Sequence, residues 1–169
     1  MSLPIGIDNM IKELSRKQCW GISAGPPNGS YIVLHFGERI KRNYPINNKN
    51  LLYGLDKDVG EYGLGIYCAW RIQKGGVPIT GSSESNHQGG PLVEGLLNIL
   101  NKSIDKIEIV DECGDLALDF DDVLLKIFCS NTGHENDDYC VQHESNWVLF
   151  HRGKAWIEVE RGCKWVVHP

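Results

Sequence analysis

The stretch Leu64-Gly-Ile-Tyr-Cys68 recurs 61 residues further along the chain as Leu125-Lys-Ile-Phe-Cys129. Both stretches keep a leucine, an isoleucine, an aromatic residue and a cysteine in the same order and at the same spacing. Apolar residues at every second position predict a β-strand with one buried face. A strand pattern that occurs twice indicates that the chain contains an internal repeat.

Two further matches flank this stretch and keep the same order. Upstream, Tyr31–Phe36 matches Asp115–Phe120, so that alternating apolar residues fall at equivalent positions. Downstream, Trp70 matches Trp147, and each tryptophan is followed six residues later by a glycine. Three matches in one order are not expected by chance, so the sequence predicts two diverged copies of one structural module.

Each copy combines a helix with antiparallel strands. Apolar residues recur at helical spacing over residues 7–16 and again over 92–100, where the preceding Gly90-Pro91 favours a helix start. The strand patterns cover residues 20–24, 30–36, 64–72 and 77–80, and then 106–110, 115–120, 125–129, 147–150 and 155–160. We therefore predict an α+β protein of two tandem diverged repeats, residues 1–85 and 86–169. Each repeat is expected to have one helix plus an antiparallel sheet of about four or five strands, and the two to form one compact unit.

Insertions distinguish the two copies. The first carries an extra segment, residues 41–61, between its second and third strands. The second carries an acidic loop, residues 130–145, between strands that are continuous in the first. Insertions in a repeated scaffold fall in loops, where binding functions are commonly placed. These two loops are the predicted location of whatever this chain recognises.

The net charge of -5 is distributed unevenly along the chain. Residues 1–85 hold ten basic and seven acidic residues, whereas residues 86–169 hold seven basic and fifteen acidic residues. A nucleic acid requires clustered basic charge, so the second half argues against a nucleic acid as the partner. An acidic surface instead favours a basic protein partner.

The composition points to the cytoplasm and to no cofactor. No apolar run approaches the ~20 residues that cross a bilayer, and no signal peptide is apparent, so we expect no membrane association. The six cysteines are scattered without regular spacing, which favours free thiols in a reducing compartment. Gly60, Gly63 and Gly65 precede a strand rather than a helix, so no phosphate-binding loop is predicted.

The segment 129–143 holds the residues most typical of a metal or catalytic site. Cys140 and His143 have a Cys-x-x-His spacing that zinc sites use, with His134 as a third candidate. Cys129 would complete the set, but its repeat-equivalent cysteine also lies in a strand pattern, so we interpret it as a core thiol. A structural metal is therefore not favoured, and the segment is interpreted as a solvated acidic loop.

Acidic residues also gather between Asp105 and Asp122, where eight carboxylates accompany one basic residue. Such a run either keeps a protein soluble or steers it toward a basic partner. Tight complexes also need buried aromatic anchors, for which Trp156 is the candidate. The predicted binding residues are Asp121, Asp122, Glu135, Asp137, Asp138 and Trp156, as charge donors and an anchor rather than catalysts.

The second half resembles a group of small bacterial proteins of immunity type. The pattern is D-L-x-L-x-F at Asp115–Phe120, L-x-I-F-C at Leu125–Cys129, an acidic stretch at Glu135–Asp138 and N-W-x-L-F at Asn146–Phe150. The resemblance implies a non-enzymatic protein that binds another protein, as immunity proteins and antitoxins do.

Two alternatives belong to other functional classes. One is a small enzyme or ligand-binding protein whose chemistry lies at His134, Cys140 and His143. The other is a structural protein that self-associates through its repeated modules. The sequence does not fix the oligomeric state.

Overall fold

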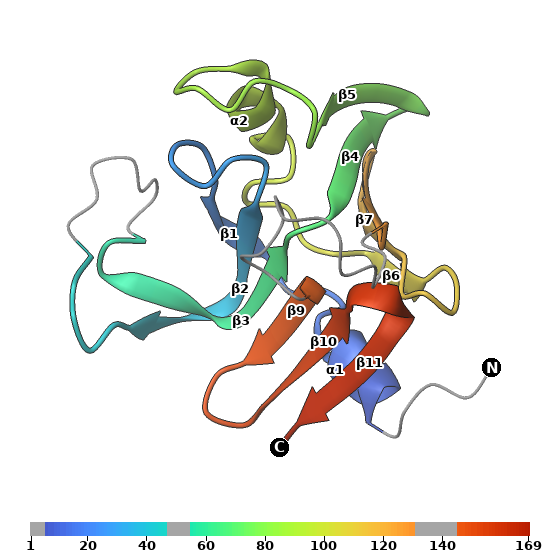
Figure 1. Cartoon of the computed structure of the whole chain (residues 1–169). Coiled ribbons are helices and arrows are strands. Elements are labelled where there is room, and N and C mark those ends of the chain that lie inside the picture. The colour runs from blue at the N-terminus through green and yellow to red at the C-terminus, as the bar shows by residue number, and fades with distance from the viewer. Residues whose placement is uncertain (1–5, 47–54, 131–144) are drawn as a thin grey trace.

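In the described part of the chain, two antiparallel sheets and two short α-helices make up the fold (Figure 1). The structure is a computed structural model, and it describes residues 6–46, 55–130 and 145–169. In chain order the elements are α1 (Ile7–Glu13), β1 (Cys19–Ser23), β2 (Ile32–Lys41), β3 (Asp58–Ile66), β4 (Ala69–Lys74), β5 (Val77–Gly81), α2 (Pro91–Leu96), β6 (Lys106–Ile109), β7 (Leu116–Phe120), β8 (Val123–Phe128), β9 (Ser145–His151), β10 (Ala155–Glu160), the 3₁₀ turn η1 (Arg161–Cys163) and β11 (Lys164–His168). The general α+β class with antiparallel sheets agrees with the prediction.

Each sheet takes strands from both halves of the chain. The six-stranded sheet has the order β1-β2-β3-β9-β10-β11, and the five-stranded sheet has the order β5-β4-β8-β7-β6. The prediction that each half forms a sheet of its own is therefore wrong. Instead, the last strands of each half join the sheet that the first strands of the other half begin.

The exchange in the first half takes place at Tyr67 and Cys68, inside the stretch that the sequence predicts as one strand. β3 ends at Ile66 and β4 begins at Ala69. The backbone amides of Tyr67 and Cys68 both donate to the Asn146 carbonyl, at 2.9 and 3.1 Å, and this closes the ladder between β3 and β9. The chain then enters the other sheet, where β4 pairs with β8.

The strand pairs that join the two halves have closely related registers. In the six-stranded sheet, Leu64 on β3 lies opposite Leu149 on β9. In the five-stranded sheet, Leu125 on β8 lies opposite Ile72 on β4. Two residues further along, an isoleucine lies opposite a tryptophan in both sheets. The two halves therefore meet through the same kinds of residue pair at the same spacing.

Two buried tryptophans fill the interior beside these pairs. Trp70 on β4 is 2% exposed, and its indole nitrogen donates to the Ser30 carbonyl at 2.9 Å. Trp147 on β9 is fully buried and donates to the Gly114 carbonyl at 2.8 Å. Each bond satisfies the polar atom of its ring, so neither of these two buried indole donors is unpaired. One buried apolar cluster includes residues of both sheets and both helices.

Both helices are shorter than the helical patterns in the sequence predict. α1 ends at Glu13, and α2 spans only six residues before the chain continues in turns. α2 packs closely on β5, because a Cβ at Gly95 would lie 2.3 Å from the Cβ of Thr80. The Thr80 hydroxyl also donates to the Pro91 carbonyl at 3.0 Å. Tertiary contact, rather than helix propensity, fixes this short element.

A disulfide joins Cys113, before β7, to Cys163 in η1. The prediction that the cysteines are free thiols is therefore wrong for these two, since residues 50 positions apart give no spacing signal. Cys19, Cys68 and Cys129 are free, as predicted. Within the described residues, no helix combines the length and the apolar character that a membrane crossing requires.

Candidate functional site

Three aromatic rings stand side by side on the outer face of the six-stranded sheet. Trp156 on β10 lies opposite Phe150 on β9 and opposite His168 on β11. Side chains alternate along a strand, so Leu149 and Ile157, next to Phe150 and Trp156, are buried while the rings face outward. We call Phe150, Trp156 and His168 the aromatic platform.

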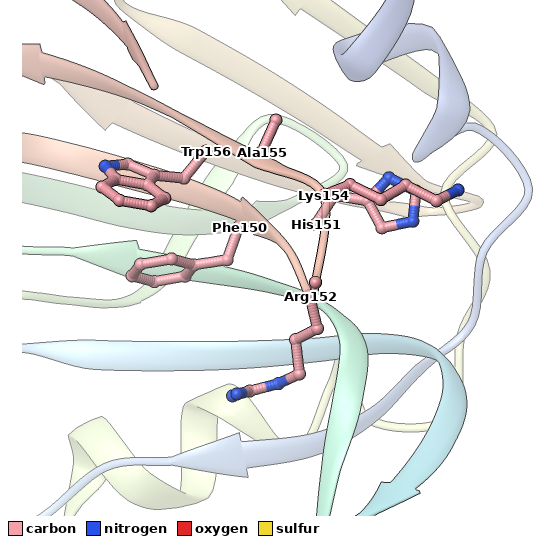
Figure 2. Close-up of a pocket in the computed structure, with 7 residues that line it drawn as sticks. Phe150, His151, Arg152, Lys154, Ala155 and Trp156 are labelled. Carbon is pink, nitrogen blue, oxygen red and sulfur yellow. The ribbon is translucent and has the colours of Figure 1, made fainter. Parts of the chain in front are cut away.

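The aromatic platform borders a cavity of about 500 Å³ that residues 150–156 line. Trp156 is 40% exposed, and its ring stacks on His168 with the centroids 4.4 Å apart and an angle of 19° between the planes. Figure 2 shows the rings of Phe150 and Trp156 on the same side of the hairpin, with Arg152 at its turn. The site therefore combines exposed aromatic surface with basic charge.

Two glycines on β3, Gly63 and Gly65, leave room for aromatic rings beside this strand. A Cβ at Gly63 would lie 3.4 Å from the ring of Phe150, and a Cβ at Gly65 would lie 2.8 Å from the hydroxyl of Tyr67. Because both positions lack side chains, the rings of Phe150 and Tyr67 lie close against the backbone of β3. Gly63 and Gly65, for which no phosphate-binding loop was predicted, thus allow close ring packing.

A chain of hydrogen bonds fixes one end of the platform. The Ser145 hydroxyl donates to Glu158 Oε2 at 2.5 Å, and His168 Nε2 lies 2.6 Å from Glu158 Oε1. Burial opposes ionisation of Glu158, but the bonds from Ser145 and His168 outweigh it and hold its pKa below its ordinary value. The carboxylate stands between the hydroxyl and the imidazole, so the histidine does not contact the serine. This order differs from a catalytic triad, in which histidine is the central member.

A second polar cluster lies beneath the turn of the β9–β10 hairpin. His151 is buried, with Nδ1 3.4 Å from Glu13 Oε2 and Nε2 3.8 Å from Glu61 Oε1. Its ring packs on Tyr62 at 4.3 Å, and the Tyr62 hydroxyl donates to Glu13 at 2.8 Å. Lys17 in turn binds Glu61 at 3.1 Å. These contacts connect α1 to β3 and β9.

The titration behaviour of this cluster is that of a structural network. Burial, and then the hydrogen bond to Glu13, raise the pKa of the Tyr62 hydroxyl. Burial opposes ionisation of Glu61, but the bond from Lys17 prevails and keeps its pKa below the ordinary value. Lys17 also lies over the Tyr62 ring, 5.1 Å from the ring centre. Lys17 thus neutralises Glu61 at the partly exposed edge of this network.

Two of the described free thiols, Cys19 and Cys129, are poor nucleophiles. Burial raises the pKa of Cys19 to about 12. The pKa of Cys129 is also raised, first by its hydrogen bond with Cys68 and then by burial. Because the thiolate is the nucleophilic form, neither thiol is activated at neutral pH.

Of the predicted acidic residues, Asp121 and Asp122 lie in the described part of the chain, in the turn between β7 and β8. Asp122 lies 2.7 Å from Lys74 Nζ and 2.5 Å from Lys102 Nζ, and these hydrogen bonds, that of Lys102 first, lower its pKa to about 2. Asp121 occupies the turn between β7 and β8 with φ 64°, and its amide donates to Asp105 Oδ2 at 2.7 Å. The other predicted residues, Glu135, Asp137, Asp138, His134, Cys140 and His143, lie outside the described residues.

Of the predicted residues, only Trp156 belongs to the aromatic platform. Asp121 and Asp122 belong to the five-stranded sheet, so the structure does not join them to Trp156 in one sheet. Sequence reasoning missed Phe150, His168 and Arg152. The available signal was the alternation from Trp156 to Glu160, which places Trp156 on an outward face.

Across the described ranges, no group of three or more His, Cys, Asp or Glu side chains is arranged to hold a metal ion. Comparison of the chain with family models, with curated proteins and with solved structures found no match. The function is therefore argued from the site itself.

Proposed function

We propose that this chain is a non-enzymatic protein-binding protein, of the immunity or antitoxin type, that uses the aromatic platform as its anchor. The observation that carries the proposal is Trp156, a large ring that remains 40% exposed beside Phe150 and a cavity of about 500 Å³. Tryptophan is the residue type most enriched among the energetic centres of protein interfaces. A partner side chain that fills the cavity would bury both rings.

The geometry around the platform supports binding over nucleophilic catalysis. Ser145 donates to Glu158, and the lowered pKa of this carboxyl makes it a weak base for activating a serine nucleophile. The described thiols Cys19 and Cys129 have raised pKa values and stay protonated. The rival proposal of an enzyme rests on His134, Cys140 and His143, outside the described residues.

We propose a basic protein as the partner. The support is the balance of seven basic against fifteen acidic residues in 86–169. Asp122 contributes little to this field, because two lysines neutralise it. The charge that steers a partner therefore comes from the other carboxylates, among which Glu135, Asp137 and Asp138 stay predicted contacts.

We also propose that the chain arose by duplication of one module. Three observations support this proposal: the matched sequence stretches, the related registers across β3–β9 and β8–β4, and the two indole bonds from Trp70 and Trp147. In the spacing that aligns Trp70 with Trp147, Trp156 corresponds to Ile79. The aromatic platform then belongs to one copy only, and the other copy supplies a natural control.

The test compares Trp156→Ala with Ile79→Ala, since Ile79 is 39% exposed on β5. The wild-type chain, immobilised, captures proteins from its native host, and the captured protein is purified and titrated against each variant. Loss of a central aromatic anchor weakens binding by about 30-fold or more, equivalent to at least about 2 kcal/mol. We expect that loss for Trp156→Ala and less than about threefold for Ile79→Ala. Equal affinities for the two variants would contradict the proposed site, and a captured protein without net basic charge would contradict the proposed partner class.

A further inference from the structure

A second cavity, of about 320 Å³, lies where β2 ends and is lined by two arginines from distant parts of the chain. Arg42 follows β2, and Arg152 sits in the turn between β9 and β10. Lys41 and Tyr44 line the same cavity. Figure 2 shows Arg152 below the ring of Phe150, and this arginine lines both the present cavity and the one beside the aromatic platform.

Both guanidinium groups are held in place by backbone carbonyls. Arg42 Nε donates to the Leu55 carbonyl at 2.8 Å, and Arg152 Nε donates to the Gly60 carbonyl at 3.0 Å. Gly60 is itself confined, because a Cβ there would lie 2.7 Å from the Phe36 amide nitrogen. Each Nε bond fixes the plane of a guanidinium, so that less side-chain entropy is lost when the terminal nitrogens bind a ligand.

The positive charge at this cavity is not balanced by carboxylates. Over residues 6–46, 55–130 and 145–169, neither Arg42 nor Arg152 makes a salt bridge, whereas Lys41 pairs with Asp58 at 2.8 Å. Two fixed cations therefore share one cavity with a surplus of donors.

The surrounding groups respond to this uncompensated charge. Burial, and then the positive charges of Arg152 and Arg42, lower the pKa of His35 to about 4. His35 is buried and accepts a hydrogen bond from the Gly60 amide at Nδ1, so it is a neutral ring at pH 7. Burial and the charge of Arg42 also lower the pKa of Arg152. An anion at the cavity would relieve the repulsion between the two arginines.

We propose that Arg42 and Arg152 bind a phosphate group, either free inorganic phosphate or the phosphate of a small monoester. A guanidinium presents parallel N–H donors that match two oxygens of a tetrahedral oxyanion, and two such groups complement its charge. The site shares Arg152 with the cavity beside the aromatic platform, but Trp156 does not line this cavity and Arg42 does not line the other, so Arg42→Gln tests phosphate binding apart from the proposed protein-binding function.

Isothermal titration calorimetry tests the proposal with sodium phosphate, glycerol phosphate and, as a charge control, sodium acetate, all at constant ionic strength. The variants are Arg42→Gln and Arg152→Gln, with Arg16→Gln as the matched control on the exposed residue after α1. Charge-assisted hydrogen bonds contribute enough that we expect each site variant to bind phosphate about tenfold or more weakly, and the control within about twofold of wild type.

The outcomes separate the sources of the phosphate group. Tighter binding of glycerol phosphate identifies a monoester ligand, and tighter binding of sodium phosphate identifies the free ion; both support the site. Absence of saturable binding to the wild-type chain, equal weakening by Arg16→Gln, or acetate binding as tight as phosphate would overturn it.

Thermal unfolding distinguishes ligand binding from a structural role. Phosphate at about 100 times its Kd stabilises a protein that binds it in the folded state, so the Tm of the wild-type chain rises while that of Arg152→Gln does not. Without phosphate, Arg152→Gln loses both the repulsion with Arg42 and the bond to the Gly60 carbonyl, so its Tm is expected to stay close to that of wild type. An earlier unfolding of the unliganded variant, with the same phosphate-induced rise as wild type, would assign Arg152 a structural role only.

Discussion

The outward faces of the two sheets differ in chemistry although their strand pairings are alike. The five-stranded sheet presents alternating charges, as in Lys106, which binds Glu108 at 2.5 Å, and in Asp119 and Lys126 beside them. The six-stranded sheet presents the aromatic platform and the glycines of β3. Mixed opposite charges make a surface that water solvates well, whereas exposed rings make a surface suited to a partner. Recognition is therefore expected on one sheet only.

The interior sides of the two sheets are alike, because each holds one buried tryptophan. The largest predicted effect tests this likeness. Trp70→Ala and Trp147→Ala each remove a buried ring with a satisfied indole, so each is expected to destabilise the fold by about 3–5 kcal/mol. Urea unfolding of the two variants measures the losses. Similar losses would support equivalent core positions in the proposed duplication, whereas a loss below about 1 kcal/mol for either one would separate the two sheets.

The second prediction concerns the titration of His35, which is buried, whereas its counterpart Asp119 lies on a solvated face. In the spacing that aligns the apolar residues of β2 and β7, His35 corresponds to Asp119. His35 is buried with a pKa lowered from 6.5 to about 4, first by burial and then by Arg152 and Arg42. Below pH 6.5 the unfolded chain binds this proton more readily than the folded chain, so stability falls as the pH decreases from about 6.5 to 4.

The size of this pH effect is about 3 kcal/mol, from 1.36 kcal/mol per pKa unit. His35→Asn retains an acceptor for the Gly60 amide and is expected to remove this part of the pH dependence. Asp119→Asn, on the solvated face, is expected to leave it in place. Unfolding free energies measured between pH 4 and 7 for the three proteins decide the matter, and an unchanged slope in His35→Asn would contradict the assignment.

The smallest predicted effect concerns the stability of the platform itself. Trp156→Ala loses the stacking contact with His168 and is expected to cost about 1 kcal/mol. Ile79→Ala, on the other copy, is expected to cost about 0.5 kcal/mol, as a surface substitution. Thermal or urea unfolding measures both. A loss above about 3 kcal/mol for Trp156→Ala would mean that the ring serves the fold rather than a partner.

The elements of the fold were largely accessible from the sequence, but their pairing was not. Alternation located the strands around Leu64 and Leu125: β8 has one buried face, and β3, which is buried at every position from Tyr62 to Ile66, alternates glycines with larger residues there. At Tyr67 and Cys68 the chain passes from one sheet to the other, and no glycine, proline or polar residue marks this point in the sequence. The change of sheet depends on the amides of these two residues, which share the Asn146 carbonyl. Pairing between β3 and β9 is a long-range contact, which local periodicity does not encode.

The site was accessible only in part, for a related reason. Trp156 stood out because its strand alternates, whereas β9 is apolar from Trp147 to Phe150, which conceals that Phe150 faces outward. Arg42 and Arg152 are far apart in the sequence, and only the fold brings them to one cavity. Conversely, Asp122 looked like a free charge in the sequence, but Lys74 and Lys102 approach it from other elements.

Hydroxyl-radical footprinting of the chain, alone and in complex with its captured partner, tests the central claim most directly. The exposed ring of Trp156 and the half-buried ring of Phe150 are expected to oxidise in the free chain and to be protected in the complex. Ile79, at the corresponding place of the other sheet, is expected to oxidise equally in both. Protection of Ile79 with unchanged oxidation of Trp156 would place recognition on the five-stranded sheet and contradict the account.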